Sequence, residues 1–333
     1  MSYRRILLAG LVGLIVHVAP LAARAGEAPA LSAKTLQTRY GRLHVETEGS
    51  GPPLVLVAGG PGASRISFQP WFSRLADRHT VVYFDAIGRG RSDRLADPAG
   101  YTVEREIEDI EAVRVALGAE RISLLGQSYG GIPALLYALR HPGRVERLVL
   151  SSAMIDAASF QANIDATNAN LKTYFPDSWM RVQALRAQGV RSGDERSGAE
   201  YARMKDMLYW YDPRRAAEMK RAEPADKFNA QVYEAMLGDD PDHVVGGTLK
   251  GYDPTPLLPS LRAPTLVIGG RYDRVATPEI VFRTHAVLPS GLARLAMFER
   301  SGHRPWVEEA DAYFDLLRKF LAGEEMPSKR GSP

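Results

Sequence analysis

A serine at the centre of a glycine-bounded pentapeptide is the residue whose surroundings most favour chemistry. Ser128 is the third residue of Gly126-Gln127-Ser128-Tyr129-Gly130. The apolar residues 122–125 predict a strand before this segment, and residues 132–139 predict a helix after it. The pentapeptide alone would also fit an ordinary glycine-rich turn. At a strand-to-helix turn, however, a serine presents its hydroxyl above the sheet edge, and small residues on both sides permit the sharp bend. We therefore predict that Ser128 is a nucleophile.

A serine nucleophile needs a histidine base, and the base needs a carboxylate that orients it. After a serine elbow of this type, the acid and then the histidine follow in chain order. Asp273 and His303 each come directly after a predicted strand, so both belong at the sheet edge that carries Ser128. Asp253 is the rival acid, but it precedes its strand. We predict the triad Ser128, Asp273 and His303.

Acyl transfer also requires hydrogen-bond donors for the oxyanion that develops in the transition state. One predicted donor is the backbone N–H of Tyr129, next to the nucleophile. The other is expected from Gly60, in the turn Gly59-Gly60-Pro61-Gly62 after the first buried strand. A second glycine-rich segment, 85–93, lacks the Lys-Ser/Thr pair of a phosphate-binding loop and is interpreted as structural.

Strands and helices that alternate along the chain would position these residues. A hairpin is expected at 36–47, and buried strands are predicted at 54–58, 81–84, 122–125, 145–150, 264–269 and 293–298. Helical spacing occurs at 71–77, 103–117, 132–139, 278–287 and 306–321. This alternation predicts an α/β fold of the α/β-hydrolase type, with a mostly parallel, doubly wound sheet.

The alternation stops in the middle of the chain. No convincing buried strand occurs in residues 153–259, which instead contain helical segments such as 201–210 and 228–237. We interpret 153–259 as an all-helical lid, called the cap below, over the carboxyl edge of the sheet. The α/β core then consists of residues 26–152 and 260–322, and residues 323–333 form a tail.

The first 25 residues have the pattern of a secretory signal peptide. Arg4 and Arg5 precede an apolar run, and Ala23-Arg24-Ala25 offers the small residues that signal peptidase requires. We expect cleavage after Ala25 and a periplasmic or secreted protein with no stable membrane association. An uncleaved N-terminal anchor is the alternative, but the apolar run is short for a membrane span.

Charge and cysteine content exclude several classes of partner. The whole chain has 42 basic and 39 acidic side chains, and three of the arginines lie in the predicted signal peptide. The expected mature chain is therefore formally neutral and lacks the basic surface of a nucleic-acid-binding protein. The chain has no cysteine, which excludes a lipid-modified N-terminal cysteine.

Together these motifs resemble the proline iminopeptidase family of α/β-hydrolases. The resemblance rests on the glycine-rich turn 59–62, the loop 88–92, the serine elbow, Gly270-Arg271-Tyr272-Asp273 and Ser301-Gly302-His303. It runs from about residue 36 to residue 321, and in the cap residues 232–236 and 247–250 resemble tricorn-interacting aminopeptidases. The resemblance implies removal of an N-terminal residue, often proline, from short peptides, or cleavage of amino-acid amides. It implies neither a cofactor nor a metal.

Two positions bear on the substrate that the resemblance implies. In this type of family member, acidic residues bind the free amine of the substrate, and Glu234 matches one of them. A second acidic residue would follow the triad aspartate, but Arg274 stands there. Arg274 either lies beside the amine or pairs with Glu234. A third departure, Ala58 in place of a common histidine, is expected to affect loop packing. We hypothesise an altered exopeptidase specificity.

The residues leave three functional readings open. The first is a hydrolase that cleaves a small peptide or amide through an acyl-enzyme. The second keeps the same machinery but acts on an ester or lactone, because many chemistries share this fold and triad. The third is a non-catalytic binding protein that uses the capped pocket, and the complete triad argues against it.

Overall fold

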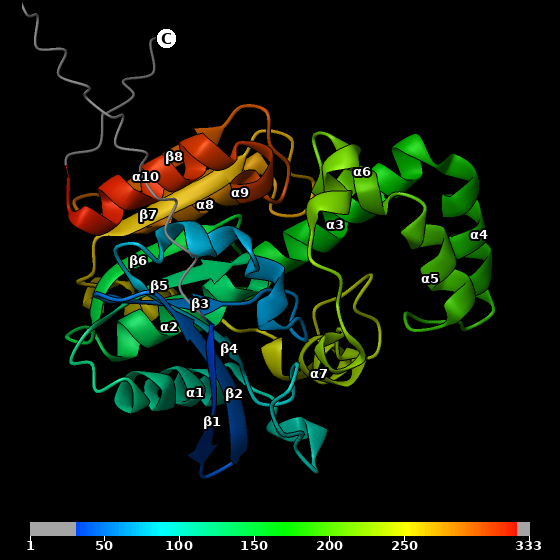
Figure 1. Cartoon of the computed structure of the whole chain (residues 1–333). Coiled ribbons are helices and arrows are strands. Elements are labelled where there is room, and N and C mark those ends of the chain that lie inside the picture. The colour runs from blue at the N-terminus through cyan, green and yellow to red at the C-terminus, as the bar shows by residue number, and fades with distance from the viewer. Residues whose placement is uncertain (1–30, 325–333) are drawn as a thin grey trace, which may run out of the picture.

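The computed structural model describes residues 31–324, which are built around an eight-stranded sheet (Figure 1). The strand order is β1-β2-β4-β3-β5-β6-β7-β8. β1 and β4 each pair antiparallel with β2, and every other neighbouring pair is parallel. The bounds are β1 Ser32–Thr38, β2 Gly41–Glu48, β3 Pro53–Val57, β4 Thr80–Asp85, β5 Ile122–Gln127, β6 Val145–Ser151, β7 Thr265–Gly270 and β8 Ala293–Phe298. The predicted α/β architecture with a mostly parallel sheet is confirmed.

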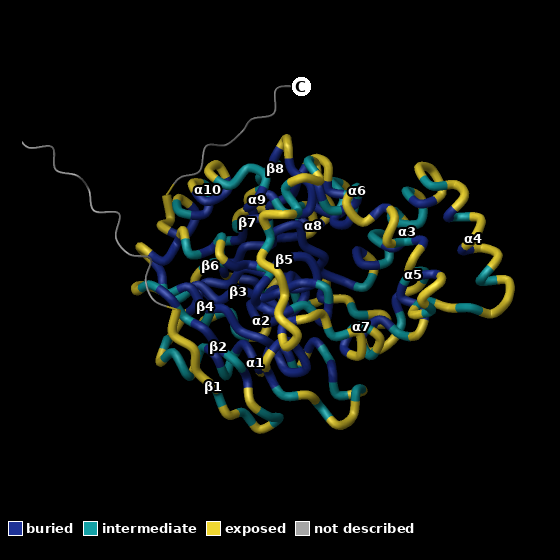
Figure 2. Tube along the Cα trace, turned by 45° about the vertical axis from the view of Figure 1, so that its right-hand side comes forward, coloured by how far each residue is buried: buried dark blue, intermediate teal, exposed yellow. Residues whose placement is uncertain are grey.

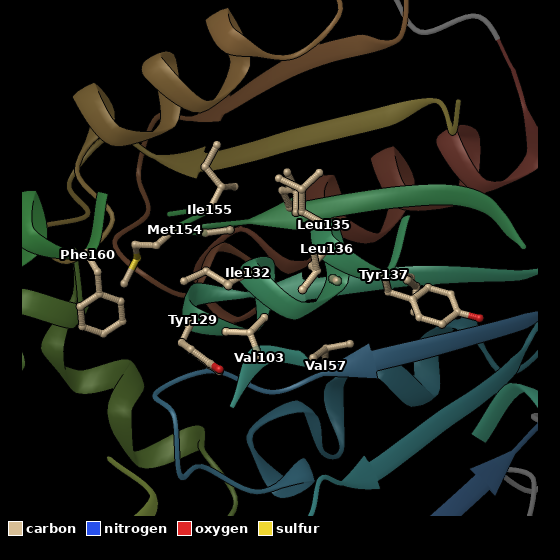
Figure 3. Close-up of a cluster of buried hydrophobic side chains, with 14 of the residues drawn as sticks. Val57, Val103, Tyr129, Ile132, Leu135, Leu136, Tyr137, Met154, Ile155 and Phe160 are labelled. Atoms are coloured by element: carbon tan, nitrogen blue, oxygen red, sulfur yellow. The ribbon is translucent and has the colours of Figure 1, made fainter. Parts of the chain in front are cut away.

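Helices cover both faces of this sheet because successive strand residues are apolar on both sides. In β3, Val55 and Val57 belong to one buried cluster, whereas Leu54 and Leu56 belong to another. The first cluster packs under α1 (Val103–Ala116), α2 (Gly131–Arg140) and α8 (Pro278–Val287), and Figure 3 shows part of it. The second packs under α9 (Pro305–Glu308), α10 (Ala310–Ala322) and the 3-10 turns Arg65–Phe68 and Trp71–Leu75.

The cap is a helical insertion between β6 and β7. Its helices are α3 (Ala157–Tyr174), α4 (Pro176–Ala187), α5 (Glu195–Ala202), α6 (Lys205–Tyr209) and α7 (Ala230–Leu237). The long helix α3 begins at a capping box, in which Asp156 and Ser159 exchange hydrogen bonds with each other's backbone. Figure 1 places the cap at one end of the sheet, and Figure 2 shows that exposed residues are frequent in its outer helices α4 and α5.

Two predicted helices are interrupted in the structure. Residues 201–210 are divided between α5 and α6, because Met204 leaves the helical region with a ψ of 2°. The predicted C-terminal helix 306–321 is divided at Glu309 into α9 and α10. The Glu309 carboxylate accepts hydrogen bonds from the backbone N–H of Arg300 and the hydroxyl of Ser301. Sequence spacing does not reveal such contacts with distant loops.

The predicted signal peptide and most of the predicted tail lie outside the described residues. Within residues 31–324, no helix combines the length and the apolar character needed to cross a bilayer.

Candidate active site

Ser128 lies at the predicted elbow between β5 and α2. Its φ is 56°, a left-handed conformation that is uncommon for a residue with a side chain. The flanking glycines permit this geometry. A β-carbon at Gly126 would lie 2.4 Å from the carbonyl oxygen of Gly130, and one at Gly130 would lie 2.2 Å from that of Val57. The elbow therefore requires glycine at both positions, as a nucleophile turn does.

The structure brings the predicted acid and base together. His303 Nδ1 lies 2.8 Å from Asp273 Oδ2, and both side chains are buried. The other oxygen, Asp273 Oδ1, accepts the backbone N–H groups of Val275 at 2.8 Å and Ala276 at 2.9 Å. The ring of Tyr209 packs edge-on against the imidazole, with 5.3 Å between centroids. This arrangement places the proton on Nδ1 and leaves Nε2 able to accept one.

The partner of His303 Nε2 is a residue to which the sequence pattern gives no role of its own. Gln127 Nε2 lies 3.0 Å from His303 Nε2, and the amide is buried. With Nδ1 protonated, the amide N–H of Gln127 donates to the lone pair that would otherwise receive the proton of Ser128. No hydrogen bond joins Ser128 to His303 among the described residues. Gln127 and Ser128 therefore compete for one acceptor.

Removing this competitor should make the nucleophile more reactive. A net hydrogen bond of about 1 kcal/mol corresponds to roughly a fivefold effect. We expect Gln127→Met, which keeps the bulk but cannot donate, to speed labelling of Ser128 by a fluorophosphonate several-fold. Gln127→Glu should slow it, because a carboxylate favours the imidazolium form, which cannot act as a base. Slower labelling of Gln127→Met would contradict this interpretation.

The segments that carry the two expected oxyanion donors both lie next to Ser128. A β-carbon at Gly59 would be 2.9 Å from Ser128 Cβ, so the glycine-rich turn that contains Gly60 lies against the nucleophile. Tyr129, the residue after Ser128, is fully buried, and its hydroxyl donates to Glu106 at 2.9 Å. Figure 3 shows the Tyr129 side chain within the core. Both backbone segments are thus held next to the serine.

The structure separates Glu234 from Arg274. Arg274 donates to Asn170 Oδ1 at 2.9 Å, and its guanidinium lies 4.9 Å from the centre of the Tyr174 ring, so it contacts α3. Glu234 is exposed on α7, where its carboxylate faces Gly193. Arg274 therefore binds the cap rather than neutralising Glu234, and the hypothesised ion pair does not form.

A cavity of about 250 Å³ opens between the cap helices and the loop that carries Asp273. Tyr209 and Val275 line it and also contact His303 and Asp273 respectively. Its lining does not include Ser128 itself. Other aromatic and apolar lining residues are Ile164, Tyr201, Met204, Leu208 and Tyr233.

One acidic side chain lines this cavity, and the sequence analysis missed it. Asp242 is partly buried there, and burial raises the pKa of its carboxyl group, which a hydrogen bond from Ser192 opposes. Its backbone N–H donates to Ser192 Oγ at 3.0 Å, and its carbonyl accepts from Asn168 at 2.8 Å. In the sequence, Asp242 belongs to Gly-Asp-Asp-Pro-Asp, a pattern typical of surface turns, so no signal marked it.

Two other cavities contain no triad residue, and one of them, of about 500 Å³, lies between Trp71 and α9. A groove of about 780 Å³ lies between the β1–β2 hairpin and α1 and α2. Across residues 31–324, no three His, Asp or Glu side chains are grouped as metal ligands would be.

Comparison with known proteins agrees with this geometry. The family model of the alpha/beta hydrolase fold matches residues 52–310. A proline iminopeptidase from Lactobacillus delbrueckii subsp. bulgaricus is 30% identical over 281 residues, which cover 82% of this chain and 90% of the relative. One from Heyndrickxia coagulans is 28% identical over 276 residues, covering 83% and 92% respectively. The crystal structure of the Mycobacterium smegmatis proline iminopeptidase superposes with a TM-score of 0.71 at 24% identity, covering 88% of this chain and 98% of that one.

Proposed function

The chain belongs to the alpha/beta hydrolase family and is related to the proline iminopeptidases, and from this premise we propose that it removes the N-terminal residue from short peptides or amino-acid amides. The observation that carries the catalytic part is the 2.8 Å contact between His303 and Asp273 beside the strained elbow at Ser128. A buried acid–base pair next to a serine of this conformation fits acyl transfer.

In the proposed reaction, Ser128 Oγ attacks the carbonyl carbon of the scissile amide while His303 Nε2 takes its proton. The N–H groups of Gly60 and Tyr129 stabilise the oxyanion. His303 then gives the proton to the leaving amine, which departs and leaves an acyl-enzyme. A water molecule, deprotonated by His303, hydrolyses the ester and restores Ser128.

We assign recognition of the substrate's free amine to the cap cavity. The charged residues of its lining are Asp242 and Lys205, of which Asp242 offers a carboxylate to the amine, and the aromatic and apolar residues suit a small side chain or a proline ring. Glu234, which the family resemblance suggested, is an exposed alternative. The likeness of residues 232–236 and 247–250 to tricorn-interacting aminopeptidases supports the same kind of substrate.

Hydrolysis of three matched substrates tests this function. The substrates are prolyl or alanyl anilide with a free amine, the N-acetylated form of the same anilide, and a short-chain nitrophenyl ester, with Ser128→Ala as the blank. We expect cleavage of the free-amine anilide and not of its acetylated form. Equal cleavage of the two anilides would contradict amine recognition, and turnover by Ser128→Ala would contradict the assigned nucleophile.

Asp242→Asn should weaken amine recognition selectively. A desolvated charge pair that loses one partner costs about 2 kcal/mol or more, so KM for the free-amine anilide should rise about 10- to 100-fold. Hydrolysis of the nitrophenyl ester should change little, because that substrate has no amine. Glu234→Gln is the matched control, and its exposed position predicts a change of less than about threefold. A larger rise in KM for the free-amine anilide in Glu234→Gln than in Asp242→Asn would assign amine recognition to Glu234 instead.

An esterase or lactonase remains the second candidate, and one observation favours it. Arg274 stands where an acidic residue would help to bind an amine, and it is turned toward Asn170 and Tyr174. Cleavage of the nitrophenyl ester with both anilides intact would support this candidate.

We also propose that the chain is exported, on the pattern of its first 25 residues. The N-terminal residue of the protein recovered from the periplasm or medium tests this proposal. Gly26 at that position would support cleavage after Ala25, and a retained Met1 would contradict it.

A further inference from the structure

An arginine next to the catalytic histidine lacks the partner that other shielded arginines have. Arg65 and Arg89 are almost fully buried, and each forms ion pairs with carboxylates. Arg304 is only partly exposed, and within residues 31–324 no carboxylate forms an ion pair with it. Burial lowers the pKa of Arg304, and Tyr209 opposes this effect. Burial would also lower the pKa of Arg65 and Arg89, but their carboxylate partners outweigh it and raise both pKa values.

Aromatic rings hold the Arg304 side chain in place. Its guanidinium carbon lies 5.6 Å from the centre of the Tyr209 ring and 5.2 Å from that of Trp210. Both contacts are of the cation–π type, which occupies the face of a guanidinium and leaves its N–H edge available. The five N–H donors have no carboxylate to bind within the described chain, so the group is suited to a planar, bidentate anion.

The position of Arg304 relates it to one side of the reaction. It follows His303 directly, and the ring of Tyr209 contacts both the guanidinium and the imidazole. Because His303 must hand its proton to the leaving group, the leaving group lies on the histidine side of Ser128. An anion carried by the leaving group is therefore the part of a substrate that approaches Arg304.

We propose that Arg304 binds a carboxylate on the leaving group of the substrate. This inference rests on the proposed function, under which the carboxylate is the C-terminal carboxylate of a dipeptide. The ligand supplies the negative charge that the protein does not, so binding offsets the cost of the desolvated guanidinium. The substrate class is then dipeptides with a free C-terminus, in preference to longer peptides or neutral amides.

A matched pair of dipeptides tests this assignment. The probes are alanylglycine and alanylglycinamide, which differ only in the charge of the leaving group. The wild type should prefer alanylglycine by about tenfold or more in kcat/KM. Arg304→Met should remove this preference through a higher KM for alanylglycine, and Arg304→Lys should keep part of it.

Arg300→Met is the control, since Arg300 is an exposed arginine in the same segment. It should leave the preference unchanged. Equal losses on both dipeptides in Arg304→Met, or no preference in the wild type, would show that Arg304 only clamps the cap residues Tyr209 and Trp210. Thermal unfolding of each variant identifies a loss that comes from misfolding.

An ester pair separates failure of this inference from failure of the proposed function. 4-Acetoxybenzoate and 4-acetoxybenzamide carry the carboxylate or its neutral amide on the phenol that leaves, and neither has an amine. If no dipeptide is cleaved but 4-acetoxybenzoate is preferred until Arg304 is replaced, the aminopeptidase proposal is wrong and the anion site stands. If 4-acetoxybenzamide reacts equally well in the wild type, the anion site is overturned.

Discussion

Asp273→Asn should lower kcat by about 10⁴-fold, the loss typical of a triad whose histidine is held in the wrong tautomer. Asp273 Oδ2 accepts the Nδ1 proton of His303 in the native site. An asparagine amide would donate to Nδ1 instead and move the proton to Nε2, which could then no longer accept from Ser128. The fold should survive, since the asparagine oxygen can still accept the backbone N–H groups of Val275 and Ala276.

Asp253→Asn is the matched control for this experiment. The sequence offered Asp253 as a rival acid, and the structure places it in an exposed turn, where its carboxylate accepts the backbone N–H of Thr255 at 2.9 Å. Its replacement should leave kcat within about twofold of the wild type. Steady-state rates on a cleaved substrate, read above the Ser128→Ala background, decide the matter. A loss of less than about tenfold in Asp273→Asn would remove Asp273 from the triad.

Local sequence patterns were sufficient to predict the acid–base pair, because the order of strands in this fold determines where the residues after each strand lie. Residues after parallel strands meet at one sheet edge, so finding Asp273 and His303 after predicted strands was enough to place them together. The elbow was similarly predictable, since the glycines around Ser128 are required by backbone contacts within a few residues and with the adjacent strand β3.

The residues that the sequence analysis missed depend on contacts between distant segments. Gln127 occupies a variable place in its motif, and only its 3.0 Å approach to His303 gives it a role. Asp242 becomes a cavity residue because Asn168 of α3 and Ser192 hold its loop in place within the cap. Arg304 is distinguished by having no ion-pair partner among the described residues. The sequence could not show this, because ion pairs depend on which distant segments meet in the fold.

The same limit applies to charge pairs. The sequence placed Glu234 and Arg274 near each other by family resemblance, but Asn170 on α3 binds the guanidinium. A side chain as long as that of arginine reaches several partners, and packing of the cap selects among them. The hypothesis about specificity therefore depended on tertiary contacts, whereas the prediction that Asp273 and His303 meet depended on local patterns.

A buried cluster of ion pairs around Arg65 joins the cap to the core. This residue follows the glycine-rich turn and pairs with Asp85 at 2.8 Å, Glu46 at 2.5 Å and Asp226 at 2.7 Å. Glu46 and Asp85 belong to core strands, whereas Asp226 belongs to the cap. One guanidinium thus holds the cap beside the turn that contains Gly60.

Arg65→Met should lower the free energy of unfolding by about 3–5 kcal/mol, because it leaves buried carboxylates without their cation. Arg39→Met is the control, since Arg39 forms an exposed pair with Glu108, and its effect on the free energy of unfolding should be much smaller. Urea unfolding at neutral pH measures both. Equal effects of the two substitutions would mean that the buried cluster does not stabilise the fold.

At acidic pH, the difference in free energy of unfolding between the wild type and Arg65→Met should become smaller. Burial alone would raise the pKa of Glu46, but hydrogen bonds from Arg65, His44 and Gln69 outweigh it and lower this pKa to about 2. A carboxyl group whose pKa is lower in the folded than in the unfolded state stabilises the fold above the unfolded value, and this contribution is lost as the pH falls from about 4 toward 2. Without Arg65, burial has a larger share in setting the pKa of Glu46, so this pKa rises. Protonation of Glu46 in acid then lowers the free energy of unfolding of Arg65→Met by less than that of the wild type. Urea unfolding repeated near pH 3 should therefore show a smaller gap than at pH 7, and a gap that widens in acid would rule out Glu46 as a charged partner of Arg65.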